Sequence, residues 1–446
     1  MDPYSREPEY LTTLVDGTVK QLNPFTGTEV WTVPGRGNRP LGVAHPHPAP
    51  LDPDAQGAHC SFCEKRYLET PPEKSRVVRR GDTTWETHHR TPAEEVFGTV
   101  AEFRRVPNLF EILSYEYWNL NYGYTLPEQV AAHREAYLAS LAGRRHVLSV
   151  IDTKLRASGR TDAEVAAMTE EARIAAASGF FGGGHDLVIA RRHHVDGATS
   201  DDQLAGAGTL TPDEHEQFIA YTLESVRGLY DLNRYARYVT VFQNWLKPAG
   251  ASFDHLHKQL VAIDERGVQH EATIAKLRAN ANLFNEVATN YAAYRNLVVA
   301  ENDHAIAFAG FGHRFPTIEV YSKSEESDPW QQSREEVRAM SDMVHAMHAA
   351  TGTAVPCNEE WHYRPIDVDL AMPWRVMLKW RVSTLAGFEG ATKIYLNTIE
   401  PAVLRDRVVD RLFALRDAHR VADSLRIASE APCRPNSLRY GRRPAR

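Results

Sequence analysis

The chain contains little cysteine and no long hydrophobic run, and both absences narrow its class. Only four of its 446 residues are cysteines: Cys60, Cys63, Cys357 and Cys433. Four scattered thiols do not form the disulfide framework of a small secreted protein. No apolar run approaches the roughly 18 residues that a membrane helix needs, and the N-terminal segment lacks the apolar core of a signal peptide. We therefore expect a cytoplasmic protein without a membrane partner.

The chain also lacks an excess of basic residues. Its formal net charge is −7, whereas nucleic-acid-binding domains usually carry a positive charge. The single basic block lies in the C-terminal tail, residues 439–446, where proline and glycine predict a frayed end. We expect no nucleic-acid partner, although nucleotides can still bind to a few local arginines.

Length and periodicity predict two related α+β domains. A chain of 446 residues exceeds the usual size of one domain. Helical and strand-like stretches follow a plan that occurs twice, with successive strands forming hairpins. We predict two tandem domains, each an antiparallel sheet with packed helices. Their bounds are 1–265, with a helical insert at about 126–178, and 266–446, with the tail at its end.

The individual elements are expected as follows. Strands are predicted within 12–34 (two strands joined by a turn) and 95–113, and at 185–191, 238–245, 253–263, 296–309, 316–322, 373–384 and 392–397. Helices are predicted within 126–178 (two or three) and at 211–236, 270–294, 333–351 and 401–420. Thr211 and Pro212 suit the N-cap and the first helical position of the helix at 211–236.

The first motif with chemical potential is His255-Leu256-His257-Lys258-Gln259. On a strand, residues two apart share a face, so His255, His257 and Gln259 would line one side. Polar side chains among apolar neighbours need partners. The alternative is a solvated strand face that happens to carry two histidines. The small residues 250–252 just upstream favour a site, because they allow a backbone to approach a phosphate closely.

The second motif is the pair Cys60 and Cys63, which can chelate one metal ion but supplies only half of a tetrahedral site. The candidates for the missing ligands are His193 or His194, together with His255. A four-ligand zinc ion at this point would be structural. The alternative is two reduced thiols in a core.

A third motif pairs Arg36 and Arg39 in a loop that contains glycine. The guanidinium fork matches phosphate oxygens, so this loop suits a phosphate clamp. An ordinary solvated loop is the alternative.

Several segments in the same order resemble galactose-1-phosphate uridylyltransferases and their adenylyltransferase relatives, which belong to the histidine triad superfamily. The segment 60–73 resembles their C-x-F-C … T-P-P-E signature, and 242–259 resembles their F-x-N … G-x-S-x-x-H-P-H-x-Q motif. The remaining matching segments are 23–40, 106–110, 184–194, 358–365 and 386–389. The resemblance covers nearly the whole chain.

Carried over residue by residue, the resemblance implies a role for each matching position. It implies one structural zinc ion held by Cys60, Cys63, His194 and His255. It implies that His257 is the nucleophile and that Gln259 holds the phosphate. It further implies phosphate contacts from Arg36, Arg39, Asn244 and Ser252, and nucleoside contacts from Asn108 and Phe110. Family members are commonly dimers, which makes a homodimer the implied assembly.

Three departures from the family pattern matter. Leu256 replaces the proline between the two histidines, which changes only strand stiffness. Pro373-Trp374-Arg375 stands where the family has H-W-H in its second domain, so we expect the second metal site to be lost and His362 to lack partner ligands. The helical insert at 126–178 could cover the active site or change its substrate preference.

These features predict a nucleotidyltransferase that resembles hexose-1-phosphate uridylyltransferases. A nucleoside monophosphate would pass from a nucleotide sugar to His257 and then to a phosphate-bearing acceptor. Because glutamine cannot act as an acid, Gln259 favours transfer over hydrolysis. If inorganic phosphate is the acceptor, the enzyme is a nucleotide-sugar or dinucleotide phosphorylase, or an adenylyltransferase. A further alternative is a non-catalytic zinc-containing nucleotide-binding protein.

Overall fold

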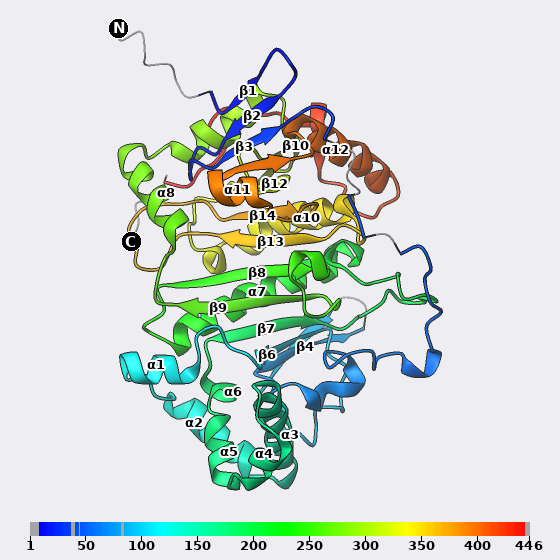
Figure 1. The fold of residues 1–446 in the computed structure, drawn as a ribbon, viewed down its shortest axis with the longest axis vertical. Helices are drawn as coiled ribbons and strands as arrows, with labels where there is room; N and C mark the ends of the chain where they lie inside the picture. Colours follow the sequence, from blue (N-terminus) through cyan, green and yellow to red (C-terminus); the bar gives the residue numbers. More distant parts are fainter. Residues whose placement is uncertain (1–8, 37–40, 44, 82–83, 442–446) are drawn as a thin grey trace.

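A long antiparallel sheet organises the molecule (Figure 1). The structure is a computed structural model that describes residues 9–36, 41–43, 45–81 and 84–441. Twelve strands form the large sheet in the order β16-β10-β11-β12-β14-β13-β8-β9-β7-β6-β4-β5. Their bounds are β4 (Ser75–Arg80), β5 (Thr84–His89), β6 (Phe103–Pro107), β7 (His185–Ala190), β8 (Tyr238–Trp245), β9 (His257–Ile263), β10 (Val298–Glu301), β11 (Ala305–Ala309), β12 (Thr317–Ser322), β13 (Cys357–His362), β14 (Arg375–Trp380) and β16 (Arg426–Ile427).

The two halves of the chain contribute six strands each, and the halves meet where β8 pairs with β13. This pairing places Glu359 opposite Gln243 and Asn358 opposite Asn244. A second, four-stranded sheet joins the ends of the chain. It contains β1 (Leu11–Thr13), β2 (Val19–Leu22), β3 (Glu29–Thr32) and the parallel strand β15 (Ile394–Asn397). The boundary predicted at residue 265 falls between β9 and the next helix, but β1–β3 pair with a strand of the second half.

Three long helices pack on one face of the large sheet: α7 (Pro212–Leu232), α10 (Arg334–Thr351) and α12 (Pro401–Asp417). At the start of α7 the Thr211 side chain accepts from the Glu214 amide, while the Glu214 carboxylate accepts from the Thr211 amide. Such reciprocal caps satisfy amides that a helix end leaves unpaired. Phe218 and Leu229 of α7 are fully buried against the sheet. The opposite face of the sheet is therefore the one left for a site.

The insert forms a helical lobe beyond the β6–β4 end of the sheet (Figure 1). It contains four helices where two or three are predicted: α2 (Glu128–Ala139), α3 (Leu141–Ala157), α4 (Asp162–Ala167) and α5 (Glu170–Ala176). The lobe has a small apolar core of its own, built on Val147, Val150 and Phe180. The neighbouring helices are α1 (Tyr115–Tyr122) and α6 (Gly179–Gly182).

Most predicted elements are present, and the predicted α+β class with antiparallel sheets is confirmed. The helix predicted at 270–294 is divided into α8 (Val268–Ala279), a π-helical turn (Asn285–Asn290) and α9 (Tyr291–Tyr294). A further short helix, α11 (Gly387–Thr392), precedes β15. No helix among the described residues is both long and apolar enough to cross a bilayer.

The tail is better packed than its composition predicts. Leu438 and Tyr440 are buried, and the Arg439 guanidinium donates to the Lys323 carbonyl at 3.1 Å. The predicted frayed end is therefore wrong up to residue 441, because buried apolar side chains hold this segment against the rest of the chain. The basic residues at 442, 443 and 446 lie outside the described residues.

Candidate functional site

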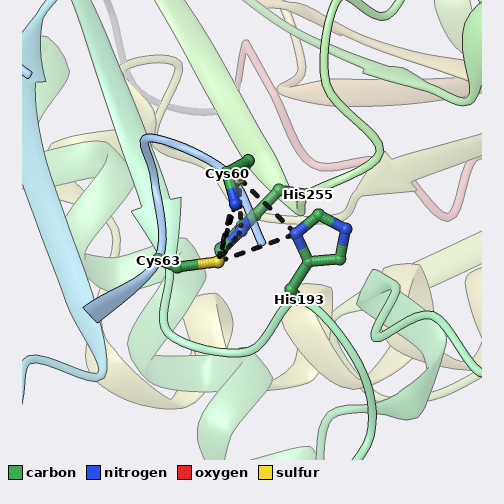
Figure 2. Close-up of side chains that lie close together, drawn as sticks. All are labelled: Cys60, Cys63, His193 and His255. Carbon is green, nitrogen blue, oxygen red and sulfur yellow. Dashed lines mark hydrogen bonds between the residues drawn. The ribbon is translucent and has the colours of Figure 1, made fainter. Parts of the chain in front are cut away.

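Two cysteines and two histidines from three segments meet at one point (Figure 2). The Cys60 and Cys63 sulfurs are 3.8 Å apart. The Nδ1 atoms of His193 and His255 lie 3.5 and 3.4 Å from the Cys60 sulfur, and 3.7 and 3.8 Å from the Cys63 sulfur. All four donor atoms lie within 4.8 Å of one another. This group could hold a metal ion. Three of its members, Cys60, Cys63 and His255, are residues for which the sequence predicts metal binding.

Backbone geometry directs these side chains toward one another. The Cys63 amide donates to the Cys60 carbonyl at 3.0 Å, which closes the turn between the thiols. His255 Nε2 donates to the Ala190 carbonyl at 2.6 Å and so leaves Nδ1 for the cluster. A hydrogen bond from Cys60 lowers the pKa of the Cys63 thiol, and contacts with His193 and His255 lower it further. A thiolate is the form that binds metals.

The histidine after β7 that completes the group is His193, so the implied ligand His194 is corrected. The His194 ring packs against the rings of His193 and His59, each at 4.7 Å between centroids. Its backbone forms a bridge with Leu204. The group of donor atoms that lie within 4.8 Å of one another contains His193 Nδ1 and no atom of His194. The sequence left both candidates open; the family motif pointed to His194, whereas the structure places His193 in the group.

His257 is the first residue of β9 and is 5% exposed. Its Nδ1 donates to the backbone carbonyl of His255 at 2.7 Å. This bond fixes the tautomer and leaves Nε2 as the nitrogen with an available lone pair. Burial lowers the pKa of His257 to about 4, so the imidazole is neutral at pH 7. A neutral, oriented imidazole can act as a nucleophile.

His255 is not on the same strand face as His257, because β9 begins at His257 and residues 253–256 form a loop. The predicted line of three polar side chains is therefore wrong for His255. The loop turns its ring toward the thiols instead. The ring of Phe62, which lies between the two cysteines, contacts the rings of His255 at 5.9 Å and His257 at 5.2 Å. The cysteine turn thus touches both histidines.

A hydrogen-bonded row leads from β6 to Gln259. The Ile112 amide donates to His185 Nδ1 at 3.2 Å, so the proton of a neutral His185 resides on Nε2. Burial lowers the pKa of His185 to about 4, which keeps it neutral. His185 Nε2 lies 3.1 Å from Gln259 Oε1 and 3.0 Å from the Asn108 amide nitrogen. With its oxygen engaged, Gln259 presents its NH₂ group as a donor.

The other predicted substrate contacts do not all lie beside this row of hydrogen-bonded side chains. Asn108 adjoins the row, because its backbone amide donates to the His185 carbonyl at 2.8 Å, and Phe110 lies two residues further on, half exposed. Asn244 on β8 accepts from Asn358 at 2.7 Å, and its own amide donates to the Gly250 carbonyl at 3.5 Å. The predicted phosphate contacts at 252, 36 and 39 are placed as follows: Ser252 is exposed in the loop before β9, Arg36 is exposed after β3 in the small sheet, and Arg39 lies outside the described residues.

Two residues that the sequence did not single out take part in this arrangement. His185 orients Gln259, and Phe62 contacts the His257 ring. Register explains the first contact, because Leu187 pairs with Gln259 and His185 lies two residues away on the same face of β7. A buried histidine on the strand next to the motif was the available signal.

Comparisons with known proteins set this geometry in context. No curated protein matches the chain. The family model "Domain of unknown function (DUF4921)" matches residues 14–440. The chain belongs to the DUF4921 family.

Solved structures share the fold of this chain. A GalT-like protein from Arabidopsis thaliana aligns with a TM-score of 0.55 at 17% identity, covering 88% of this chain and 98% of that one. An ADP-glucose phosphorylase from Arabidopsis thaliana with bound ADP-glucose aligns with a TM-score of 0.56 at the same identity and the same coverage. A uridylyltransferase also matches, with a TM-score of 0.41 at 18% identity over 52% of this chain and 75% of that one. The resemblance stated from the sequence is confirmed at the level of the fold.

Proposed function

We propose that this chain is a nucleotidyltransferase that moves a nucleoside monophosphate from a nucleotide sugar to a phosphate-bearing acceptor. The observation that carries the proposal is the buried, neutral His257, whose Nδ1–H is bound to a carbonyl and whose Nε2 is left for attack. The fold shared with the GalT-like protein and the ADP-glucose phosphorylase supports it.

The reaction has two balanced steps. His257 Nε2 attacks the α-phosphorus, an N–P bond forms, and the bridging P–O bond breaks so that a sugar 1-phosphate leaves with the electron pair. The imidazole becomes cationic while it retains its Nδ1 proton, and the His255 carbonyl 2.7 Å away stabilises that charge. An oxygen of the acceptor phosphate then attacks phosphorus, the N–P bond breaks, and the neutral imidazole returns.

Gln259 is the partner we assign to the nucleotidyl phosphate. Its oxygen is engaged by His185, so its NH₂ group donates to a non-bridging oxygen. It has no acidic proton for a leaving group and does not activate water, which favours transfer over hydrolysis. A hydrogen bond to a charged group contributes about 1.5–3 kcal/mol. Gln259→Ala should therefore slow nucleotidyl transfer to His257 by at least about tenfold.

We assign the metal as one structural zinc ion held by Cys60, Cys63, His193 and His255. With Zn–S near 2.3 Å and Zn–N near 2.0–2.1 Å, a tetrahedral site requires about 3.8 Å between sulfurs and about 3.6 Å between sulfur and nitrogen. The distances of 3.8 Å and 3.4–3.8 Å meet both values. With four protein ligands the ion would supply rigidity, because it would keep no open coordination position.

Labelling with nucleotide sugars that carry a radioactive α-phosphate tests the proposal. We expect acid-labile label on the wild type that is lost in His257→Asn. The matched control is His194→Asn, which changes a nearby histidine outside the cluster and should retain the label. If the wild type stays unlabelled while it binds these nucleotides, the protein is a binding module and the proposal fails.

The acceptor is identified by the second step. Chase of labelled protein with inorganic phosphate should release a nucleoside diphosphate if the enzyme is a phosphorylase. Chase with a hexose 1-phosphate should release a nucleotide sugar if it is a uridylyltransferase-like enzyme. The fold shared with ADP-glucose phosphorylase is the reason to include adenine and uracil nucleotides in both arms.

A further inference from the structure

A cavity of about 380 Å³ lies against β13 and β14 and is also lined by the turn between β2 and β3. It is on the same face of the large sheet as the His257 site. Register shows this, because Phe242 of β8 pairs with Gln259 on one side and with Glu360 on the other, and Glu360 pairs with Met377. Glu360 and Met377 line the cavity. Adjacent strands are about 4.8 Å apart, so the cavity begins about 10 Å from Gln259.

The cavity is strongly cationic. Its lining includes four basic side chains, Arg314, Arg375, Lys379 and Arg381, and one carboxylate, Glu360. Lys379 Nζ lies 2.5 Å from Glu360 and uses that carboxylate. The other buried carboxylate of this region, Glu319 on β12, is engaged by His313 and Tyr321. Within the described ranges, none of the three arginines forms an ion pair.

Arg314 and Arg381 converge on one aromatic ring. Their guanidinium carbons lie 4.9 and 4.6 Å from the centre of the Phe315 ring. The Nε atom of each is buried without a hydrogen-bond partner among the described residues. Burial, together with the charge of Arg314, lowers the pKa of Arg381. Two guanidinium groups that repel each other with unpaired N–H groups form a place where an anion would be stabilised.

Packing against aromatic rings does not by itself account for this arrangement of arginines. Cation–π contacts orient a guanidinium but do not neutralise it or satisfy its in-plane donors. Arg375, 7% exposed, is similarly placed against the rings of Phe25 and Phe284, each at 4.9 Å, and donates to the Tyr321 hydroxyl at 3.4 Å. Three charges held in this way cost desolvation that an anionic ligand would offset.

The remaining lining suits a hydroxylated ring. Neutral polar side chains and a half-buried tyrosine surround the arginines, and those that can contact a sugar are Thr26, Thr28, Gln269, Thr273 and Tyr395. A volume of about 380 Å³ lies within the range of small-molecule pockets. We propose that this cavity binds a phosphorylated sugar, with the phosphate between Arg314 and Arg381. This site is separate from His257, and the inference does not depend on the proposed function.

The two sites are linked through two asparagines. Arg381 donates to Asn358 Oδ1 at 2.7 Å, and the Asn358 amide donates to Asn244 Oδ1 at 2.7 Å. Because Arg381 is tied to the His257 side in this way, Arg314 is the better residue to change. Arg314 has no such connection among the described residues.

Calorimetric titration with glucose 1-phosphate, inorganic phosphate and unphosphorylated glucose tests the inference in the His257→Asn background, where turnover cannot occur. We expect the sugar phosphate to bind, glucose not to bind, and Arg314→Gln to weaken sugar phosphate binding at least tenfold. Glu360→Gln removes the one carboxylate and should tighten binding severalfold. The matched control is Arg227→Gln, an arginine with a side chain 68% exposed on α7, which should change nothing.

The outcomes separate this inference from the proposed function. Arg314→Gln in an otherwise wild-type chain should leave labelling of His257 unchanged. Absence of label on the wild type would therefore contradict the proposed function and would not bear on this inference. Equal binding by wild type and Arg314→Gln, or equal binding of glucose and its phosphate, would overturn the inference. Weaker binding of the sugar phosphate by Glu360→Gln would overturn it as well. This second variant keeps the test decisive even if Arg314→Gln does not fold. If inorganic phosphate binds as tightly as the sugar phosphate, the site recognises the phosphate alone, and the proposed sugar recognition is overturned.

Discussion

Replacing Glu111 with glutamine should make the stability of the protein less dependent on pH. Glu111 follows β6, and its two carboxylate oxygens lie against the backbone of Gly179 and Gly183, where a Cβ would approach them within 2.4 and 2.0 Å. Oε1 is buried without a hydrogen-bond partner among the described residues. Burial raises the pKa of Glu111 to about 7, against the opposing charges of Lys154 and Lys74. The carboxyl group is therefore easier to bury protonated.

The sign and size follow from linkage. Below an unfolded-state pKa of 4.5, both states hold the proton and the variant resembles the wild type. Between that value and about 7, the folded wild type binds more protons than the unfolded chain, so its stability falls as the pH rises. A shift of about 2.5 units at about 1.36 kcal/mol per unit gives about 3 kcal/mol as the largest loss. Glutamine does not ionise and does not show this loss.

Urea unfolding at 25 °C, repeated from pH 5 to pH 8, measures the effect. The advantage of Glu111→Gln over the wild type should grow as the pH rises and become constant above about pH 7.5. Taking the difference between the two proteins removes the contribution of all other titrating groups. Glu135→Gln, at an exposed position on α2, serves as the control and should show a difference that does not vary with pH. A constant difference for Glu111→Gln as well would refute the reasoning.

Three further predictions concern the surroundings of His257: its neighbour Lys258 on β9, the proposed zinc site and the Phe62 ring. Lys258→Met leaves Glu359 buried without its lysine partner and should lower the free energy of unfolding by about 3–5 kcal/mol, measured by urea titration; Lys258→Met/Glu359→Leu should recover much of it. Removal of the proposed zinc ion with a chelator should lower the unfolding free energy by about 3 kcal/mol when free zinc had been about 100-fold above its Kd, measured by the same titration with zinc restored as the control. Phe62→Ala should slow labelling of His257 by about 10- to 100-fold because the ring loses its side support, while metal content measured by atomic absorption stays the same.

Elements with local signals were predictable from the sequence. The helix starting at Thr211 carries its cap, its first-turn proline and its apolar spacing within about 20 residues, and α7 begins and ends close to the predicted bounds. The strand at 238–245 matches β8 to the residue. Its β-branched and aromatic residues favour a strand, and burial alternates along most of it because one face packs on α7 and the other faces the site.

The strand that joins the two halves was not predictable in this way. β13 has the sequence Cys-Asn-Glu-Glu-Trp-His, in which two adjacent acids argue against a buried strand. Glu359 is nevertheless fully buried, because Lys258 lies 2.5 Å away and His348 lies 2.6 Å away on α10. Those partners come from distant parts of the chain, 101 residues away in the case of Lys258. Local propensity contains no information about such a pairing.

The choice between His193 and His194 shows a second limit. Both follow the same strand, and the spacing from β7 does not determine which ring faces the thiols. The outcome depends on the turn of a loop that pairs with residues 203–205. The same limit applies to His255, whose place before β9 depends on a hydrogen bond to the Ala190 carbonyl. In both cases tertiary contacts, rather than side-chain type, decide which ring faces the thiols.

The alternation of β9 explains why the site and the junction of the two halves depend on the same few residues. His257 and Gln259 point to the open face, whereas Lys258 between them points to the helix side, with its ammonium 4.8 Å from the Phe218 ring of α7. Lys258 reaches across β8 to Glu359 on β13, and the same lysine contacts Gln243 at 3.3 Å. A fully desolvated pair of this kind is poorly tolerant of register slips, because a shift by one residue would place a charge in the site and a histidine in the core. The ion pair therefore fixes the register that presents His257 and Gln259 together, and its disruption should impair labelling as well as stability.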